Sequence, residues 1–141
     1  MLIDALINAY STAKARDWNK LYWAVDLHST CLIPNYEKGI PTQFYLGAKE
    51  TLKTMSERSD IVLIMYTCSH PGEIEEYLNM FSLFGINFKY VNINPEVPDN
   101  AYGYFKDKFY FNVLLDDKAG FNPNEDWQVI RKFLEEIPPL K

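Results

Sequence analysis

The stretch Leu21–Thr30 reads "LYWAVDLHST" and sets the pattern for the rest of the chain. Its first half is a continuous apolar run, which is typical of a strand that is buried on both faces of a sheet. The run stops at Asp26, and a carboxylate, an imidazole and two hydroxyls then follow within five residues. Polar groups directly after a buried strand indicate a functional site at the carboxyl end of that strand.

Strands and helices alternate along most of the remaining sequence. The apolar runs in "DIVLIMYT", "FKYVNINP" and "FYFNVLL" predict three further strands. Apolar residues recur at helical spacing between the first three strands, with Thr42 and Asn122 as expected N-caps and Gly85 as a helix stop. We expect helices over 2–15, 42–58, 70–85 and from 122 onward, and strands over 21–25, 60–67, 88–95 and 109–115.

Strands that alternate with helices and are apolar along their length imply a parallel sheet covered on both faces. Right-handed crossovers then place every carboxyl end at one edge of the sheet, where such folds bind ligands. We therefore expect Asp26, Thr67 and the pair Asp116–Asp117 to converge in one crevice. The predicted fold class is α/β, with one domain over 1–141 in which 1–20 form an N-terminal helical extension.

The composition narrows the classes of function. The chain has 141 residues, 48% of them hydrophobic, which is enough for one buried core. Its formal net charge of −5 argues against general nucleic-acid binding, which depends on clustered Lys and Arg. We recognise neither a signal peptide nor a membrane-spanning run, and expect no membrane partner. Cys31 and Cys68 form no metal-binding pattern, so we expect free thiols, no zinc and a cytoplasmic location.

Four segments resemble, in order, the motifs of the haloacid dehalogenase-like (HAD) superfamily. "DLHST" resembles the first motif, "DxDxT", and Thr67 at the end of "IVLIMYT" resembles the second. Lys108 resembles the third motif and "LLDD" the acidic fourth, and "VNINP" is similar to a segment of the small, nearly capless members. The resemblance runs from about Trp23 to the C-terminus and implies a Rossmann-like HAD fold, a parallel sheet flanked by helices, with a minimal cap.

The chemistry of such a site can also be argued from the residues. An anionic phosphomonoester resists attack by a carboxylate, so the site must supply positive charge and hold the reacting atoms in line. Mg²⁺ prefers oxygen ligands, which suits Asp26 together with one of the two terminal aspartates.

The resemblance implies a Mg²⁺-dependent phosphohydrolase whose substrate is a small-molecule phosphomonoester. Asp26 would be the nucleophile, forming an aspartyl-phosphate. It would share the ion with the main-chain carbonyl of His28 and with Asp116, while Asp117 would hold a water ligand of the ion. The identity of the leaving group is left open by the sequence.

Thr67 and Lys108 complete the site that the resemblance implies. Thr67 would donate a hydrogen bond to the phosphoryl oxygens, and Lys108 would neutralise the charge shared by phosphate and nucleophile. Ser69 competes with Thr67 for the first role, and Lys106 with Lys108 for the second. We prefer Thr67 because it directly ends an apolar strand, and Lys108 because its spacing to the acidic pair matches the family pattern.

Position 28 departs from that pattern, in which a second aspartate protonates the leaving alcohol and then activates water. This chain has His28, whose ordinary pKa of about 6.5 suits acid–base work at neutral pH. Ser29 stands where the family has a glycine. Three interpretations follow: an active phosphohydrolase with His28 as its acid–base residue, an enzyme that hydrolyses its intermediate slowly, and a module that binds phosphate and metal without turnover.

Several residues near these motifs have simpler explanations. We interpret His70 as a helix-start residue and both cysteines as packing residues. Four tyrosines are candidates for a substrate-facing rim, although packing or surface positions are the simpler explanation: Tyr36, Tyr45, Tyr102 and Tyr104. Tyr36 directly follows the first motif and is the best placed of them to contact a leaving group.

Overall fold

A computed structural model of the protein describes residues 1–99 and 103–141. Four parallel strands form one sheet in the order β3-β2-β1-β4. The strands are β1 (Leu21–Val25), β2 (Ile61–Met65), β3 (Tyr90–Val91) and β4 (Val113–Leu115), and the helices are α1 (Leu2–Ala15), α2 (Ala48–Glu57), α3 (Pro71–Leu83), a short 3-10 helix η1 (Asp117–Ala119) and α4 (Asp126–Glu136). The predicted α/β fold with a parallel, Rossmann-like sheet is confirmed.

The register brings the carboxyl ends of the strands to one level. Val25 of β1 pairs with Met65 of β2 and with Leu115 of β4, and Met65 pairs with Val91 of β3. Each of these residues is the last of its strand, so the chain leaves all four strands at the same height. The residues that directly follow the strands, among them Asp26 after β1 and Asp116 after β4, therefore lie side by side at one edge of the sheet, as the sequence predicts.

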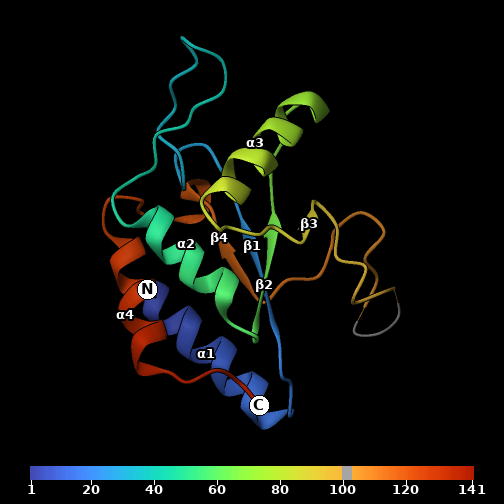
Figure 1. The fold of residues 1–141 in the computed structure, drawn as a ribbon. Helices are drawn as coiled ribbons and strands as arrows, with labels where there is room; N and C mark the ends of the chain where they lie inside the picture. The colour runs from blue at the N-terminus through green and yellow to red at the C-terminus, as the bar shows by residue number, and fades with distance from the viewer. Residues whose placement is uncertain (100–102) are drawn as a thin grey trace.

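The two faces of the sheet are covered by different kinds of structure. On one face, the odd-numbered residues of β1 and β2, such as Trp23 and Leu63, share a core with buried residues of all four α-helices, such as Leu6 and Trp127. Figure 1 shows α1, α2 and α4 on that side and the chain between β3 and β4 on the other. Residues 92–99 and 103–112, which contain no helix, thus lie on the face opposite α1, α2 and α4.

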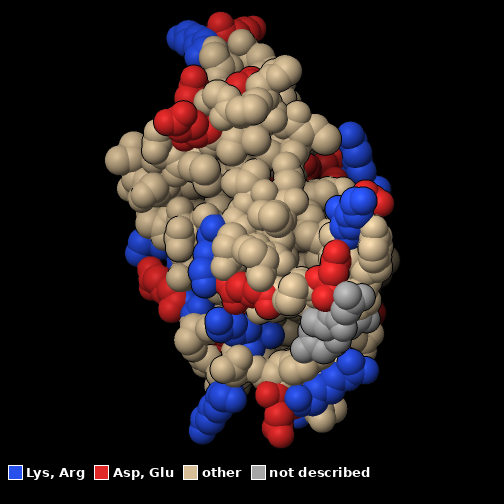
Figure 2. All heavy atoms as spheres, turned by 90° about the vertical axis from the view of Figure 1, so that its right-hand side faces the viewer, with Lys and Arg blue, Asp and Glu red and all other residues tan. Residues whose placement is uncertain are grey.

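The direction of the crossovers explains this asymmetry. The chain steps from β1 to β2 to β3 in one direction across the sheet, but from β3 it returns past both to β4. Because crossovers between parallel strands are right-handed, the return must run over the opposite face. Among the described residues of this returning segment, Val97 and Asn94 are buried, at 6% and 5% exposure. Figure 2 views this side and shows a wide area with neither acidic nor basic side chains.

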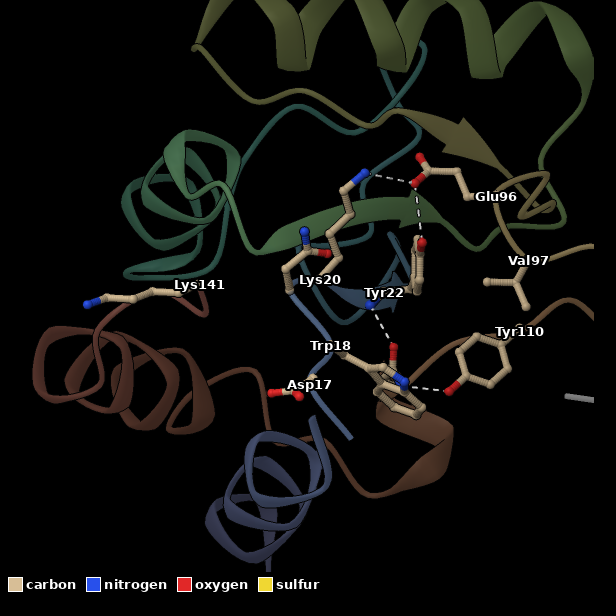
Figure 3. Close-up of a pocket in the computed structure, with 10 residues that line it drawn as sticks. Asp17, Trp18, Lys20, Tyr22, Glu96, Val97, Tyr110 and Lys141 are labelled. Atoms are coloured by element: carbon tan, nitrogen blue, oxygen red, sulfur yellow. Dashed lines mark hydrogen bonds and ion pairs between the residues drawn. The ribbon is translucent and has the colours of Figure 1, made fainter. Parts of the chain in front are cut away.

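Glu96 connects the returning segment to the sheet through hydrogen bonds and ion pairs. Its carboxylate accepts hydrogen bonds from Tyr22 Oη at 3.2 Å and Tyr90 Oη at 2.7 Å, and forms ion pairs with Lys20 at 3.3 Å and Lys89 at 2.8 Å. Figure 3 shows Lys20 and Tyr22 converging on it. Although partial burial opposes the charge, the hydrogen bonds from Lys89, Tyr90 and Lys20 lower the pKa of Glu96 to about 2.

Three strands, β2, β3 and β4, are shorter than predicted, and an asparagine limits each of the last two. The Asn112 side chain, in place of a main-chain carbonyl, accepts the Tyr22 N–H at 2.8 Å. Strand β4 therefore begins at the next residue, Val113. Asn92 has a φ of 54°, in the left-handed region, and β3 ends before it. Asparagine tolerates both roles because its short amide can imitate a peptide group.

Two helices begin later than predicted. Residues 42–45 are extended because the chain there pairs with the loop after β1, where Ile33 N–H bonds Gln43 O and Tyr45 N–H bonds Cys31 O. Thr42 is therefore not an N-cap, and α2 begins at Ala48. Before α4, Asn122 lies in a turn and its N–H donates to Asp126 Oδ2 at 2.7 Å, so the helix begins four residues beyond it.

The other two helices agree with the sequence. Helix α1 covers Leu2–Ala15, and α3 has Pro71 as its first residue and His70 at its N-cap. Gly85 ends α3 with a φ of 76°, where Ile86 N–H bonds Phe81 O in a Schellman turn. Within 1–99 and 103–141, no helix combines the length and the apolar character needed to cross a membrane.

Candidate active site

Three carboxylates meet at the carboxyl edge of the sheet. Asp26 follows β1, whereas Asp116 and Asp117 follow β4, the neighbouring strand. One oxygen of each lies within 4.8 Å of the other two, and all three side chains are half-buried. Hard divalent cations such as Mg²⁺ take oxygen ligands, so the donor set fits such an ion. Zn²⁺ prefers nitrogen and sulfur, which these residues do not offer.

Burial and the neighbouring carboxylates both disfavour the ionised form of Asp26. Burial, which is the largest cause, and the charge of Asp116 raise the pKa of Asp26 to about 7, with a smaller effect of Asp117. A hydrogen bond from Thr30 partly opposes this rise. A divalent cation held among the three oxygens would remove the repulsion and favour the ionised form of Asp26.

Thr30 connects the two acidic segments. This fully buried residue accepts the Asp117 N–H at 3.0 Å, and its hydroxyl lies 3.1 Å from Asp26 Oδ2 and 3.3 Å from Asp117 Oδ1. A hydroxyl has one proton, so it donates to one of the two carboxylates at a time. Trp127 of α4 holds Thr30 in place by donating its indole N–H to the Thr30 carbonyl at 2.8 Å.

The loop after β1 keeps a tight turn without a glycine. Ser29 has a φ of 62°, the left-handed conformation that glycine adopts without strain. The N–H of Ser29 bonds Leu32 O, and the N–H groups of Cys31 and Leu32 bond Leu27 O. These hydrogen bonds hold Ser29 in the left-handed conformation.

Thr67 is positioned by Asn92 at the end of the neighbouring strand. The Asn92 amide accepts the Thr67 N–H at 2.9 Å and donates to the Thr67 carbonyl at 2.7 Å. The Thr67 and Ser69 hydroxyls lie 2.8 Å apart, and Ser69 N–H donates to Thr67 Oγ1 at 3.2 Å. The two hydroxyls that compete in the sequence are thus hydrogen-bonded to each other.

All six residues expected at the site line one cavity of about 1110 Å³. They are Asp26, His28, Thr67, Lys108, Asp116 and Asp117. Of the alternatives, Ser69 also lines this cavity, whereas Lys106 is absent from its lining. Lys108 is exposed on the returning segment, with its Nζ 5.8 Å from the centre of the Phe111 ring. The roles of these residues stay predictions, but their convergence is a property of the structure.

His28 lies between two tyrosines. Its Nε2 is 2.6 Å from the hydroxyl of Tyr77, a fully buried residue of α3, and its ring centroid is 5.5 Å from that of Tyr36. Burial lowers the pKa of His28, and the Glu73 carboxylate only partly offsets this effect. Burial also raises the pKa of Tyr77. The favoured pair at neutral pH is therefore a neutral imidazole and a protonated phenol.

Sequence reasoning missed three residues of this site. Thr30 could have been recognised as the last position of "DxDxT". Asn92 carries a weaker signal, because asparagine directly after a strand often adopts a left-handed conformation. Tyr77 gave no signal, since its position on α3 reads as an ordinary core residue.

Other expectations near the site had mixed outcomes. Cys31 is buried, as expected of a packing residue, but Cys68 is exposed and lines the cavity, so the packing interpretation is wrong for it. Tyr36 lines the cavity, whereas Tyr45 and Tyr104 do not. Tyr102 lies outside the described residues.

A second cavity, of about 600 Å³, lies at the opposite edge of the sheet (Figure 3). It is lined by Trp18, Tyr22 and Tyr110 together with charged residues that include Lys20 and Glu96. The only cluster of three acidic ligands found among residues 1–99 and 103–141 is the one at the carboxyl edge. The candidate site for metal-dependent chemistry is therefore the larger cavity.

Removing Asp116 tests the metal site by thermal denaturation. At a concentration one hundred times its Kd, Mg²⁺ should stabilise the parent chain by about 2.7 kcal/mol. Asp116→Asn should lose most of this gain, yet should melt above the parent in the absence of divalent ions because it relieves the repulsion on Asp26. Asp107→Asn is the matched control, since Asp107 lines the same cavity outside the acidic cluster. Equal Mg²⁺ responses of all three proteins would contradict the metal site.

Comparisons with known proteins support the fold but give no function. No protein-family model matches the chain, and no curated protein matches it. A solved structure of a conserved protein from Bacteroides thetaiotaomicron is similar, with a TM-score of 0.64 and 23% sequence identity. The similarity covers 84% of this chain and 92% of that one. At this identity the likeness establishes a shared fold only.

Proposed function

We propose that the protein is a Mg²⁺-dependent phosphohydrolase that cleaves phosphomonoesters through an aspartyl-phosphate on Asp26. The observation that carries the proposal is the meeting of Asp26 with Asp116 and Asp117, in a cavity that Thr67 and Lys108 also line. Such an arrangement combines a carboxylate nucleophile, oxygen ligands for a cation, and donors for phosphate. A cytoplasmic location and membership of the HAD superfamily belong to the same proposal.

The residues of the cavity divide the work of the first step. Asp26, Asp116 and the His28 carbonyl would hold Mg²⁺, which supplies positive charge against the phosphoryl oxygens. A free oxygen of Asp26 would attack phosphorus, the bond to the leaving oxygen would break, and the resulting alkoxide would take its proton from a water molecule in the cavity. Thr67 donates its hydroxyl to the phosphoryl group, while the Lys108 ammonium lowers the repulsion between two anions.

His28 is better suited to the second step than to the first. A neutral imidazole has no proton of useful acidity to give to a leaving alcohol, but its free nitrogen can accept one from water. If Nε2–H donates to the Tyr77 hydroxyl, Nδ1 carries a lone pair and can serve as the base. Water activated in this way would attack phosphorus, releasing phosphate and restoring the Asp26 carboxylate.

The same feature favours a second candidate function. Because burial keeps His28 neutral, the protonation of an alkoxide leaving group has no efficient donor there. A module that binds Mg²⁺ and phosphate without turnover would show the same acidic cluster and the same cavity. Metal-dependent stabilisation is common to both candidates, so only turnover separates them.

His28 variants distinguish these candidates through phosphate release measured with and without Mg²⁺. Under the hydrolase proposal the parent chain turns over only with Mg²⁺, and His28→Gln lowers the rate by roughly 10²-fold, at the lower end of general acid–base effects. His28→Asp should retain turnover, because aspartate is also a competent base.

A silent parent chain would contradict the hydrolase proposal. If His28→Asp gained activity in that case, the scaffold would be competent and the binding module would be the correct function. If every variant stayed silent while Mg²⁺ still raised the melting temperature, the metal site would stand without the reaction.

A further inference from the structure

Aromatic side chains form one wall of the cavity that contains Asp26. Tyr66 directly precedes Thr67, and its ring centroid is 5.9 Å from that of Phe109 on the returning segment. Phe109 in turn lies 5.7 Å from Phe111, in an edge-to-face arrangement. All three residues line the cavity, and Tyr66 is 40% exposed. Phosphoryl chemistry uses none of these rings, so their accessible surface requires another explanation.

The loop after β1 contributes two further rings to the lining of the same cavity. Tyr36 is 57% exposed and its centroid is 5.5 Å from that of His28, with the two rings tilted by 53°. A group attached to the phosphoryl oxygen would therefore share the cavity with the Tyr36–His28 pair and with the wall formed by Tyr66, Phe109 and Phe111.

The charges of the cavity restrict the leaving group further. Five carboxylates line it but only two ammonium groups: Asp26, Glu73, Asp107, Asp116 and Asp117 against Lys108 and Lys118. One divalent cation would offset part of this negative charge. The phosphoryl group of the substrate is itself an anion, so it would take up the positive charge that the cation supplies. A second anionic group on the substrate would meet uncompensated negative charge.

We propose that the substrate is a phosphomonoester whose leaving group carries a planar aromatic ring and no further negative charge. Stacking of a ring on exposed aromatic side chains contributes binding energy that a saturated group of the same size does not gain. The ring can belong to an aryl-bearing alcohol or to the base of a nucleoside. This inference rests on the proposed function, since it names the substrate class of the same site.

Matched pairs of substrates test the ring separately from leaving-group chemistry. Benzyl phosphate and cyclohexylmethyl phosphate both release a primary alcohol, and only the first is planar. We expect kcat/KM with Mg²⁺ to be roughly tenfold higher for benzyl phosphate. 4-Carboxybenzyl phosphate should be poorer than benzyl phosphate, because it adds a negative charge. A nucleoside 5′-monophosphate and ribose 5-phosphate form a second pair, which shows whether the ring is a nucleobase.

Variants locate the preference on the aromatic wall. Tyr66→Leu and Phe109→Leu keep an apolar side chain but remove a ring, so they should reduce the benzyl preference to about twofold or less. Tyr104→Leu is the matched control, since Tyr104 is an exposed aromatic residue of the same segment outside the cavity lining. A melting curve of each variant verifies that it is folded.

A non-hydrolysable ligand separates failure of this inference from failure of the proposed function. Benzylphosphonate with Mg²⁺ should raise the melting temperature more than cyclohexylmethylphosphonate, whether or not the protein turns over. Preferential binding without turnover would support the inference and contradict the hydrolase. Turnover with equal kcat/KM within the benzyl pair would overturn the inference and leave the hydrolase standing. A benzyl preference that survives in Tyr66→Leu and Phe109→Leu would also overturn it.

Discussion

Replacing Asp26 by asparagine is expected to lower Mg²⁺-dependent phosphate release by at least about 10³-fold. The amide cannot attack phosphorus, and it also removes a negative ligand from the cation site. The loss should lie in kcat, because Thr67 and Lys108 remain to bind phosphate. The measurement is initial phosphate release under saturating Mg²⁺, with benzyl phosphate as the first substrate.

Asp107→Asn is the control for this experiment. It removes one carboxylate from the same cavity, but Asp107 lies outside the acidic cluster and is exposed. We expect it to change kcat little. A rate for Asp26→Asn comparable with that of the parent chain would rule out Asp26 as the nucleophile, whatever its role in metal binding.

The largest expected loss of stability follows the substitution Asp60→Asn. The fully buried Asp60 carboxylate accepts two hydrogen bonds of 2.9 Å from the Arg58 guanidinium. It also accepts the Leu140 N–H at 3.1 Å and the Tyr10 hydroxyl at 3.3 Å. Asp60→Asn removes the negative charge that compensates the Arg58 cation, which should lower the free energy of unfolding by about 3 kcal/mol or more. A chain of this size should then melt roughly 10 °C lower.

The same group predicts how stability depends on pH. Burial disfavours the charge of Asp60, but the hydrogen bonds from Arg58 and Leu140 outweigh it and hold the pKa of Asp60 below its usual 3.8. A carboxyl with a lowered pKa in the folded state stabilises the fold above its unfolded pKa. That stability is lost as the pH falls below about 4 and through the folded pKa. Asp60→Asn should therefore weaken the dependence of unfolding free energy on pH in this acidic range.

An exposed ion pair provides the comparison for Asp60. Lys53 and Glu57 form an i,i+4 pair of 2.9 Å whose side chains are 57% and 63% exposed. Glu57→Gln should cost about 0.5 kcal/mol or less. If Asp60→Asn cost no more than Glu57→Gln in the same urea titration, the buried network around Arg58 would not contribute to stability as described.

The sequence predicts which residues meet at the carboxyl edge of the sheet better than it predicts where the helices and strands begin and end. Asp26 and Asp116 could be placed side by side because each directly follows an apolar run, and parallel strands end at one edge. The start of α2 could not be found in this way, because Thr42 is a good N-cap by type but its segment pairs with the loop after β1. Tertiary pairing of this kind overrides local propensity.

The sequence also does not predict the hydrogen bonds that orient the side chains of the site. The hydrogen bond between His28 and Tyr77 joins residues 49 positions apart, and neither residue type indicates the other. The same holds for Asn92, whose amide positions Thr67 from a neighbouring strand. Motifs identify reactive groups, whereas the partners that set their protonation and orientation come from the packing of distant segments.

The most direct test of the account is a search for the covalent intermediate in His28→Gln. If Asp26 is the nucleophile and His28 the base of the second step, this variant forms the aspartyl-phosphate but hydrolyses it slowly. Acid quenching during turnover of benzyl phosphate with Mg²⁺, followed by peptide mass spectrometry, should find one added phosphoryl group on Asp26. The double variant with Asp26→Asn should show none. Phosphate release without any phosphoryl group on Asp26 would contradict the account.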